Sequence, residues 1–363
     1  MIEKRAPGKL FVAGEYAVVE PGQPAVLVAV DRCITVRLTE SQDAGRVHSS
    51  EYGQAPLVWV RDENGENIVL EHRPADYVLS AISIVEELRS SFGAPPRYFD
   101  LDISSELDDA SGRKFGLGSS GAVTVATIAA LDEFYALGLT RTERYKLALL
   151  ATIAIAPNAS GGDLAASTFG GWIRYSSPDR AALKLHREVH GVASALHCSE
   201  WAGSGATRII PPESLRLLVG WTGSPASTEH LVKRVHTPGD EKPLPFESFT
   251  SESRACVDAL VDAFDQDDAA VALENIRQTR RLLQRLGESS GSRIETDQLR
   301  LLCDIAETYG AAAKPSGAGG GDCGIALSDA SLPTIDILRE WERHGIQRLS
   351  LSPHRAEGGI DEF

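Results

Sequence analysis

A glycine-rich loop with two adjacent serines, Gly116-Leu-Gly-Ser-Ser-Gly121, has the residue types needed to hold a phosphate group. Glycines let backbone N–H groups approach a phosphate closely, and the hydroxyls of Ser119 and Ser120 can bind phosphate or Mg²⁺. The loop runs directly into the apolar stretch Ala122–Tyr135, which predicts a buried helix. The positive N-terminal end of that helix would face the loop, so the chemistry indicated is the binding of an anion.

Three other classes of glycine-rich loop fit these residues less well. A dinucleotide-binding loop follows a strand and has an acidic residue about twenty positions later, but the residues before Gly116 are loop-like and no acid stands at that place. Val123 completes the glycine pattern of protein kinases, yet the VAIK lysine and the HRD and DFG motifs are missing. No GxxxxGK[ST] loop occurs. Two interpretations remain for the loop alone, an anion cradle or a tight turn that leads into a buried helix.

Two further glycine segments accompany this loop. The first is Ala6-Pro-Gly-Lys-Leu-Phe-Val-Ala-Gly-Glu-Tyr-Ala-Val-Val-Glu-Pro-Gly22, and the second is Lys314-Pro-Ser-Gly-Ala-Gly-Gly-Gly-Asp-Cys-Gly324. With the central loop between them, these segments resemble the three motifs of the GHMP kinases, in the family's order and over nearly the whole chain. That family includes galactokinase, homoserine kinase, mevalonate kinase and phosphomevalonate kinase, so the resemblance implies a small-molecule kinase that uses ATP.

Within the family, the motifs are most similar to the bacterial-type phosphomevalonate kinase branch. Mevalonate kinases usually have GEH where this chain has Gly14-Glu15-Tyr16, and they carry an additional acidic Mg²⁺ ligand that is not found here. The resemblance therefore implies phosphorylation of (R)-5-phosphomevalonate to 5-diphosphomevalonate, with ATP converted to ADP. Two alternatives stay open: another member such as mevalonate or homoserine kinase, or a non-catalytic ligand sensor. Intact Lys9, Ser120 and Asp163 argue against the sensor.

The resemblance assigns the catalytic roles to Lys9 and Asp163. The segment Gly161-Gly-Asp163 resembles the part of the family that supplies a catalytic aspartate, and Lys9 matches the active-site lysine. Without the resemblance, Asp163 would be interpreted as a helix cap and Lys9 as a solvated surface charge.

The acceptor decides what these two residues must do. An alcohol acceptor needs a general base, which Asp163 would provide. A phosphate monoester has a second pKa of about 6, so its attacking oxygen is mostly deprotonated at neutral pH. The main obstacle is then repulsion between two phosphate groups, which Lys9, Mg²⁺ and the helix N-terminus would reduce. Asp163 would position Lys9 and the acceptor, or take the residual proton.

The remaining expected site residues follow from the same motifs. ATP is expected to contact Lys114, Gly116, Leu117, Gly118, Ser119, Ser120 and Gly121. The phosphorylated acceptor is expected to contact Lys9, Tyr16, Ser160, Ser316, Gly317, Ala318 and Arg280. The acceptor's carboxylate needs a cation, for which Arg280, Arg174 and Lys114 are alternatives. Mg²⁺ is the expected cofactor, bound by phosphates and by Ser120.

The elements that must position these residues indicate an α+β protein, because strands and helices are interspersed without strict βαβ alternation. Strands are predicted at Ala25–Leu38, Tyr98–Ile103, Gly171–Tyr175, Leu215–Trp221, Ile325–Ser328 and Ile346–Leu351. Helices are predicted at Asp76–Ser90, Ala122–Tyr135, Thr142–Ala156 with Thr142 as N-cap, over most of Ser251–Tyr309, and at Thr334–His344. Ser176–Pro212 has only a weak pattern.

The resemblance implies two domains with the active site in the cleft between them. Residues 1–207 would form the N-terminal domain with the ATP loop, and residues 208–363 the C-terminal domain with the segment Lys314–Gly324.

Composition limits the partners. The net charge of −15 over 363 residues argues against nucleic acid, which is bound by clustered Lys and Arg. Five widely spaced cysteines without a CxxC pair indicate reduced thiols. The N-terminus has no apolar signal segment, and no apolar stretch is long enough to span a bilayer. We therefore expect a cytoplasmic protein, monomer or homodimer, whose partners are ATP and a small phosphorylated acid.

Overall fold

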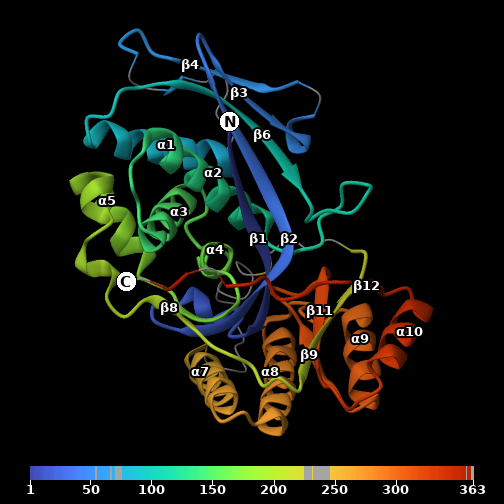
Figure 1. The fold of residues 1–363 in the computed structure, drawn as a ribbon. Coiled ribbons are helices and arrows are strands. Elements are labelled where there is room, and N and C mark those ends of the chain that lie inside the picture. The colour runs from blue at the N-terminus through green and yellow to red at the C-terminus, as the bar shows by residue number, and fades with distance from the viewer. Residues whose placement is uncertain are drawn as a thin grey trace.

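The computed structural model describes residues 1–53, 55–65, 68–69, 76–224, 231, 246–356 and 358–360. Over these residues strands and helices are interspersed, so the predicted α+β class is confirmed. The strands form two sheets, with the long strands of the first running down toward the second (Figure 1).

The first sheet is built around a long antiparallel pair. Its strands follow the order β5-β4-β3-β6-β2-β7-β8, and β1 pairs with β2 off this path. The bounds are β1 Ile2–Ala13, β2 Pro24–Ser41, β3 Gly45–Ser49, β4 Leu57–Arg61, β5 Ile68–Val69, β6 Tyr98–Ser105, β7 Trp172–Ser176 and β8 Gly205–Arg208. The β1–β2 register jumps between Pro7 and Lys9. This irregularity lies at the predicted catalytic lysine.

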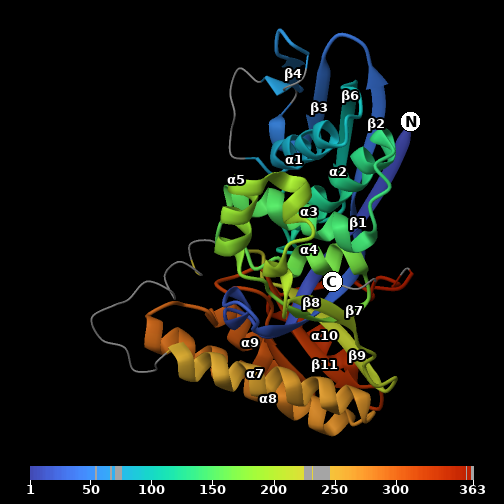
Figure 2. The same cartoon turned by 90° about the vertical axis from the view of Figure 1, so that its left-hand side faces the viewer.

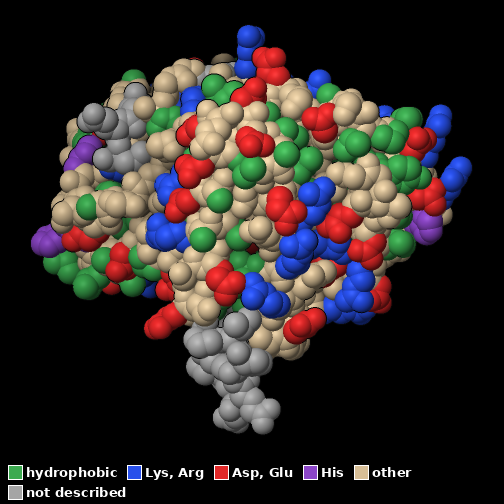
Figure 3. All heavy atoms as spheres, turned by 90° about the horizontal axis from the view of Figure 1, so that it is seen from below, with side chains coloured by type: hydrophobic (Ala, Val, Ile, Leu, Met, Phe, Trp, Pro, Cys, Tyr) green, Lys and Arg blue, Asp and Glu red, His purple; other side chains and the backbone are tan. Residues whose placement is uncertain are grey.

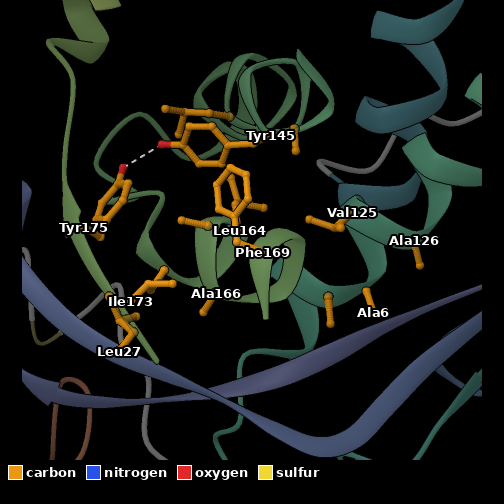
Figure 4. Packing of buried hydrophobic residues seen from close by; sticks show 14 of the residues in the cluster. Ala6, Leu27, Val125, Ala126, Tyr145, Leu164, Ala166, Phe169, Ile173 and Tyr175 are labelled. Atoms are coloured by element: carbon orange, nitrogen blue, oxygen red, sulfur yellow. Dashed lines mark hydrogen bonds between the residues drawn. The ribbon is translucent and has the colours of Figure 1, made fainter. Parts of the chain in front are cut away.

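Helices gather on one face of this sheet, as Figures 1 and 2 show. They are α1 Tyr77–Ser91, α2 Ser119–Tyr135, α3 Arg141–Ile155, α4 Gly162–Phe169 and α5 Arg180–Ala195. Figure 4 shows the core around α4, where Tyr145, Phe169 and Tyr175 lie among apolar side chains that include Leu27 and Ile173. The hydroxyls of Tyr145 and Tyr175 are 2.8 Å apart and share a hydrogen bond. This core holds the predicted catalytic helix α4 against the sheet.

One prediction about these helices was wrong, and a segment for which no element was predicted contains a helix. The N-cap of α3 is Thr140, whose hydroxyl accepts from the Glu143 N–H while the Glu143 carboxylate accepts from the Thr140 N–H. Thr142 is instead a buried residue of the first turn. The weakly patterned segment Ser176–Pro212 contains α5, the short 3₁₀ helix η3 (Ser199–Trp201) and β8. Gly191, with φ 80°, interrupts α5 and divides its apolar pattern.

The second sheet has the strand order β10-β11-β9-β12. Its strands are β9 Leu215–Trp221, β10 Ala312–Pro315, β11 Cys323–Asp329 and β12 Gln347–Leu349. The helices that accompany it are α7 Phe246–Asp265, α8 Ala269–Ser290, α9 Asp297–Thr308 and α10 Thr334–Arg343. In Figure 2, α7 and α8 lie side by side along the lower edge of the molecule. The predicted strand at Leu215–Trp221 and the helix beginning at Thr334 are confirmed.

The chain crosses between the sheets twice among the described residues. It leaves the first sheet at Arg208, enters the second at Leu215, and returns after β12. On its return, Pro353 pairs with Val30. The Gly171 N–H also donates to the His354 carbonyl at 3.0 Å. The domain division between residues 207 and 208 stays a prediction, and part of the predicted C-terminal domain packs on the first sheet.

Acidic and basic side chains are mixed over the face seen from below in Figure 3, where α7 and α8 lie. Exposed ion pairs on α7 and α8 join Arg285 to Glu252 and Arg281 to Glu274. None of the described helices combines the length and apolar character needed to cross a bilayer. All five cysteines are free thiols.

Candidate active site

Strand β1 lies directly against the central glycine loop. The Lys9 N–H donates to the Leu117 carbonyl at 2.8 Å, and the Lys9 Nζ donates to the Gly116 carbonyl at 3.3 Å. A Cβ at Gly118 would lie 3.0 Å from the Lys9 Cε. The lysine side chain therefore lies across the loop and needs glycine beneath it. Lys9 is only 8% exposed, which excludes the alternative of a solvated surface charge.

The N-terminus of α2 is open to an anion. Gly118 is its N-cap, in the left-handed conformation with φ 80°, and no side chain caps the helix there. Ser119 and Ser120, the first two helical residues, are partly exposed. The first-turn N–H groups and two hydroxyls are thus available to phosphate oxygens, as the predicted nucleotide cradle requires.

Asp163 faces the same loop from the first turn of α4. Its Oδ2 would lie 2.7 Å from a Cβ at Gly121. Its Oδ1 accepts from the Leu164 N–H at 3.0 Å. The N-cap of α4 is Gly161, with φ 80°, so Asp163 is not the helix cap that the alternative interpretation assumed. The structure brings Lys9 and Asp163 together around Gly118 and Gly121.

The charges of Lys9 and Asp163 stabilise each other in a desolvated site. Burial lowers the pKa of Lys9, and the carboxylate of Asp163 opposes that shift most strongly. Burial raises the pKa of Asp163, and the ammonium of Lys9 opposes that shift in turn. Each group therefore helps to keep the other ionised, which suits Lys9 for neutralising phosphate charge.

The segment Lys314–Gly324 is fastened to β1 and to Glu15, which follows it. Lys314 and Glu15 form a buried ion pair. The Ser316 hydroxyl accepts from the Phe11 N–H and donates to the Phe11 carbonyl, both at 2.9 Å. These contacts fix the second glycine segment beside the strand that carries the predicted catalytic lysine.

Several predicted acceptor-binding residues lie at this junction. The Tyr16 hydroxyl donates to the Ala318 carbonyl at 2.5 Å, so the proton of this hydroxyl, like that of Ser316, is used by the main chain. Gly317 has φ +84° and open space where a Cβ would stand. Ser160 lies two residues before the α4 helix, and its hydroxyl accepts from the Gly162 N–H at 3.3 Å. Contact of these residues with an acceptor stays a prediction.

The cationic side chains predicted to bind the acceptor's carboxylate form ion pairs with carboxylates of the protein itself. Arg280 is buried among three carboxylates, those of Glu295, Asp304 and Glu307, at 2.8, 2.6 and 3.0 Å. This network argues against the prediction that Arg280 binds the acceptor, because its charge is already more than balanced. Arg174 pairs with Asp258 at 2.8 Å, and exposed Lys114 pairs with Glu51.

Sequence reasoning missed two charged residues at the site. The Asp322 side chain fills the space beside Gly116, where a Cβ would lie 2.5 Å from its Cγ, and its charge favours the protonated form of Lys9. Arg180 donates to the carbonyls of Val19 and Ala159, at 2.5 and 3.2 Å, next to Ser160. Asp322 belongs to the glycine segment Lys314–Gly324, which the sequence analysis recognised. Arg180 is the first residue of α5, a helix that the sequence pattern did not predict.

The variant Asp322→Asn is expected to lower kcat/KM about tenfold and to move the alkaline limb of the pH–rate profile to lower pH. Removal of a nearby anion destabilises the Lys9 ammonium, whose pKa then falls further. Steady-state kinetics from neutral to alkaline pH measure both effects. Asp329→Asn, on the far end of β11 where Ser331 binds the carboxylate, is the matched control and should change neither. An unshifted alkaline limb in Asp322→Asn would contradict this role.

Comparison with known proteins places the chain and its fold in one family. The sequence model of the GHMP kinases N terminal domain matches residues 76–171, and that of the GHMP kinases C terminal domain matches residues 265–347. The chain belongs to the GHMP kinase family. It is 46% identical to the phosphomevalonate kinase of Streptomyces sp. (strain CL190), over 97% of each chain.

Two solved structures agree with this assignment. A protein from Listeria innocua superposes with a TM-score of 0.90 at 34% identity, covering 98% of each chain. The phosphomevalonate kinase of Streptococcus pneumoniae, in complex with phosphomevalonate and AMPPNP, superposes with a TM-score of 0.85 at 30% identity. That match covers 97% of this chain and 100% of the other. The predicted fold is therefore confirmed over nearly its full length.

Proposed function

We propose that this protein transfers the γ-phosphoryl group of ATP to (R)-5-phosphomevalonate, giving 5-diphosphomevalonate and ADP in the mevalonate route to isoprenoids. The observation that carries the proposal is the 46% identity to a phosphomevalonate kinase over 97% of both chains. The geometry of Lys9, Asp163 and the α2 N-terminus supports it, because these groups surround one anion-binding loop.

The arrangement suits a reaction limited by charge repulsion. The phosphates of ATP would bind at the first turn of α2, with the helix dipole and the Lys9 ammonium on adjacent sides. The acceptor phosphate already carries a deprotonated oxygen near neutral pH, since its second pKa is about 6. Lys9 would neutralise the charge that accumulates between the two phosphates. Asp163 would keep Lys9 protonated and in place, and would take the proton of the monoanion fraction.

Mg²⁺ is the metal that the residues at this loop fit. Mg²⁺ prefers oxygen ligands and usually binds one or two protein oxygens together with substrate phosphates. The Ser120 hydroxyl and the Asp163 carboxylate are such donors, and Asp163 lies against Gly121, the residue that follows Ser120. Ser120 would hold the ion, with Asp163 as its protein partner. When bound, Mg²⁺ supplies further neutralisation of phosphate charge.

The acceptor would lie between the α4 N-terminus and the segment Lys314–Gly324. Ser160 and the open backbone around Gly317 provide polar groups there, and Arg180 provides a cation beside Ser160. Every group in this proposal comes from one chain, so a monomer or a homodimer would both be active. The free thiols fit a reducing compartment such as the cytoplasm.

An ADP-release assay with phosphomevalonate, mevalonate and homoserine in parallel tests the proposed function. We expect kcat/KM for phosphomevalonate to exceed that for either other substrate by at least about 100-fold, because a site built to bind a charged group rejects compounds that lack it. ADP release with mevalonate alone or homoserine alone would overturn the substrate assignment. A chain that binds nucleotide but releases no ADP with any of the three would instead be a ligand sensor.

A further inference from the structure

A second cluster of chemically active side chains lies at the end of α5. His186 comes from α5, Cys198 immediately precedes η3, and Glu200 lies within η3. One donor atom from each, a ring nitrogen, the thiol sulfur and a carboxylate oxygen, lies within 4.8 Å of the others. The His186 Nδ1 and a Glu200 carboxylate oxygen are 3.4 Å apart. All three residues are partly exposed, so an ion from solvent can reach them.

The segment that carries Cys198 and Glu200 is fixed by buried contacts. The Trp201 Nε1 donates to the Ala195 carbonyl at 2.8 Å, and the indole ring packs against Tyr145 with centroids 6.2 Å apart. Lys146 donates to the Leu196 carbonyl at 3.2 Å. The connection between α5 and η3 is therefore attached to α3 on both sides of Cys198, which limits how far the thiol and carboxylate can separate.

A hydrogen bond and a ring contact also hold the imidazole of His186 in one orientation. Its Nε2 shares a hydrogen bond with the Ser194 hydroxyl at 2.9 Å, while its Nδ1 is the nitrogen that faces Glu200. A metal-binding histidine commonly uses its second ring nitrogen in this way, because the hydrogen bond fixes the tautomer and the ring plane. The ring of His190 packs against that of His186, with centroids 4.7 Å apart, and further restricts its rotation.

The donor set selects a class of ion. Ca²⁺ and Mg²⁺ prefer oxygen ligands, whereas a thiolate combined with imidazole and carboxylate suits Zn²⁺ and chemically similar ions. Zn²⁺ is tetrahedral, with a sulfur ligand at about 2.3 Å and a nitrogen ligand at about 2.0–2.1 Å, and it accepts three protein ligands plus water. Donors that already lie within 4.8 Å of one another require only small side-chain rotations to reach that geometry.

We propose that His186, Cys198 and Glu200 form a binding site for one Zn²⁺-class ion, separate from the kinase site. On binding, the thiol loses its proton to solvent and a sulfur–metal bond replaces its hydrogen bond to the Ala195 carbonyl. Water fills the fourth position. The site rests on the cluster's own geometry and does not depend on the proposed function.

Cobalt substitution tests the site directly. The full-length chain is stripped with a chelator, freed of it, and titrated with CoCl₂ and then ZnCl₂ in the absence of nucleotide. We expect one Co²⁺ per chain with a near-ultraviolet thiolate-to-cobalt charge-transfer band, which stoichiometric Zn²⁺ removes. Cys198→Ser should abolish the band and weaken Zn²⁺ binding by roughly 100-fold or more, and Ser194→Ala should weaken it by roughly tenfold.

Two control variants test whether any thiol or any His–Glu pair would behave the same way. Cys256→Ser removes another partly exposed thiol, and His344→Ala removes a histidine whose Nδ1 lies 3.7 Å from a carboxylate oxygen of Glu340. Both should leave the band and the affinity unchanged. The variants should match the wild type in melting temperature without metal and in kinase kinetics, since none of these residues contacts the glycine loops in the structure described.

A wild-type chain without the charge-transfer band would overturn the proposal and leave His186 and Glu200 as a surface ion pair. A band that persists in Cys198→Ser would overturn it equally, because the sulfur ligand would then come from another cysteine. Neither result changes the outcome expected in the ADP-release assay, so the metal site and the proposed kinase activity are tested independently.

Discussion

Replacement of Lys9 by Met is expected to lower kcat/KM for phosphomevalonate by about 1,000-fold or more. Asp163→Asn is expected to lower it by less than about 100-fold. Lys9 is a buried cation of β1 that contacts the central glycine loop, so under the proposed function its removal leaves the repulsion between two phosphates uncompensated. The acceptor is already largely deprotonated, so loss of the Asp163 carboxylate removes a positioning group and one proposed Mg²⁺ ligand rather than an obligatory base. Steady-state kinetics with phosphomevalonate and ATP measure both losses.

The pH dependence of the same variants separates positioning from base catalysis. In the wild type the acid limb should follow the acceptor phosphate, near its second pKa of about 6. Asp163→Asn removes the anion that does most to favour the Lys9 ammonium, so the pKa of Lys9 falls and the alkaline limb moves to lower pH. The acid limb should stay in place. Lys4→Met, a partly exposed lysine of the same strand that pairs with Glu133, is the matched control and should retain activity.

Equal collapse of Lys9→Met and Asp163→Asn, together with a steep acid limb that disappears when Asp163 is replaced, would contradict this assignment. Asp163 would then act as a true general base. The burial that raises its pKa would already favour that role, since a base is most effective when its pKa approaches the working pH.

Lys314→Met is expected to destabilise the fold by about 3–5 kcal/mol, because it leaves the Glu15 carboxylate buried without its counter-charge. Neither side chain is more than 2% exposed, and one Glu15 oxygen, Oε2, accepts no hydrogen bond among the described residues. The uncompensated charge is costly, whereas a neutral pair is tolerated. The double variant Glu15→Gln, Lys314→Met should therefore recover much of the loss. Urea unfolding of the wild type, both single variants and the double variant measures this as a double-mutant cycle.

An exposed pair provides the control for this cycle. Arg285 and Glu252 join α8 to α7 at the surface, and Arg285→Met should cost less than about 1 kcal/mol. A double variant as unstable as the sum of its single variants would show that Glu15 and Lys314 contribute independently, and would contradict the pairing argument.

Local signals in the sequence were sufficient for the parts of the site that local structure builds. A run of glycines and serines followed by small apolar residues predicts a cradle and a buried helix, and Gly118 and α2 form that arrangement. The mostly apolar stretch Leu215–Trp221 predicted β9 at its observed bounds. These features are determined by residues that are adjacent in the chain, so they can be predicted from a single sequence.

Features that depend on distant residues were not predictable in the same way. The Arg280 guanidinium forms ion pairs with Glu295, Asp304 and Glu307. Nothing in the sequence around Arg280 shows that these carboxylates surround it. Likewise, Asp322 acquires its place because β9 and β11 pair and bring its loop to Gly116. The charge of a side chain is visible in the sequence, but its partners are set by tertiary packing.

The return of the chain to the first sheet has a mechanical consequence. Ser352 is held to Asp31 by two hydrogen bonds, of 2.9 and 3.0 Å, and the His354 N–H donates to the Ala29 carbonyl at 2.8 Å. The two sheets are thus joined by two covalent tethers, one after Arg208 and one after Leu349. Two tethers restrict the rotation of one sheet against the other more than a single tether would, and the buried Lys314–Glu15 pair and the Ser316–Phe11 hydrogen bonds add non-covalent links between them. Separation of the glycine loops would break these buried contacts, so the place of Asp322 beside Gly116 belongs to the folded chain itself.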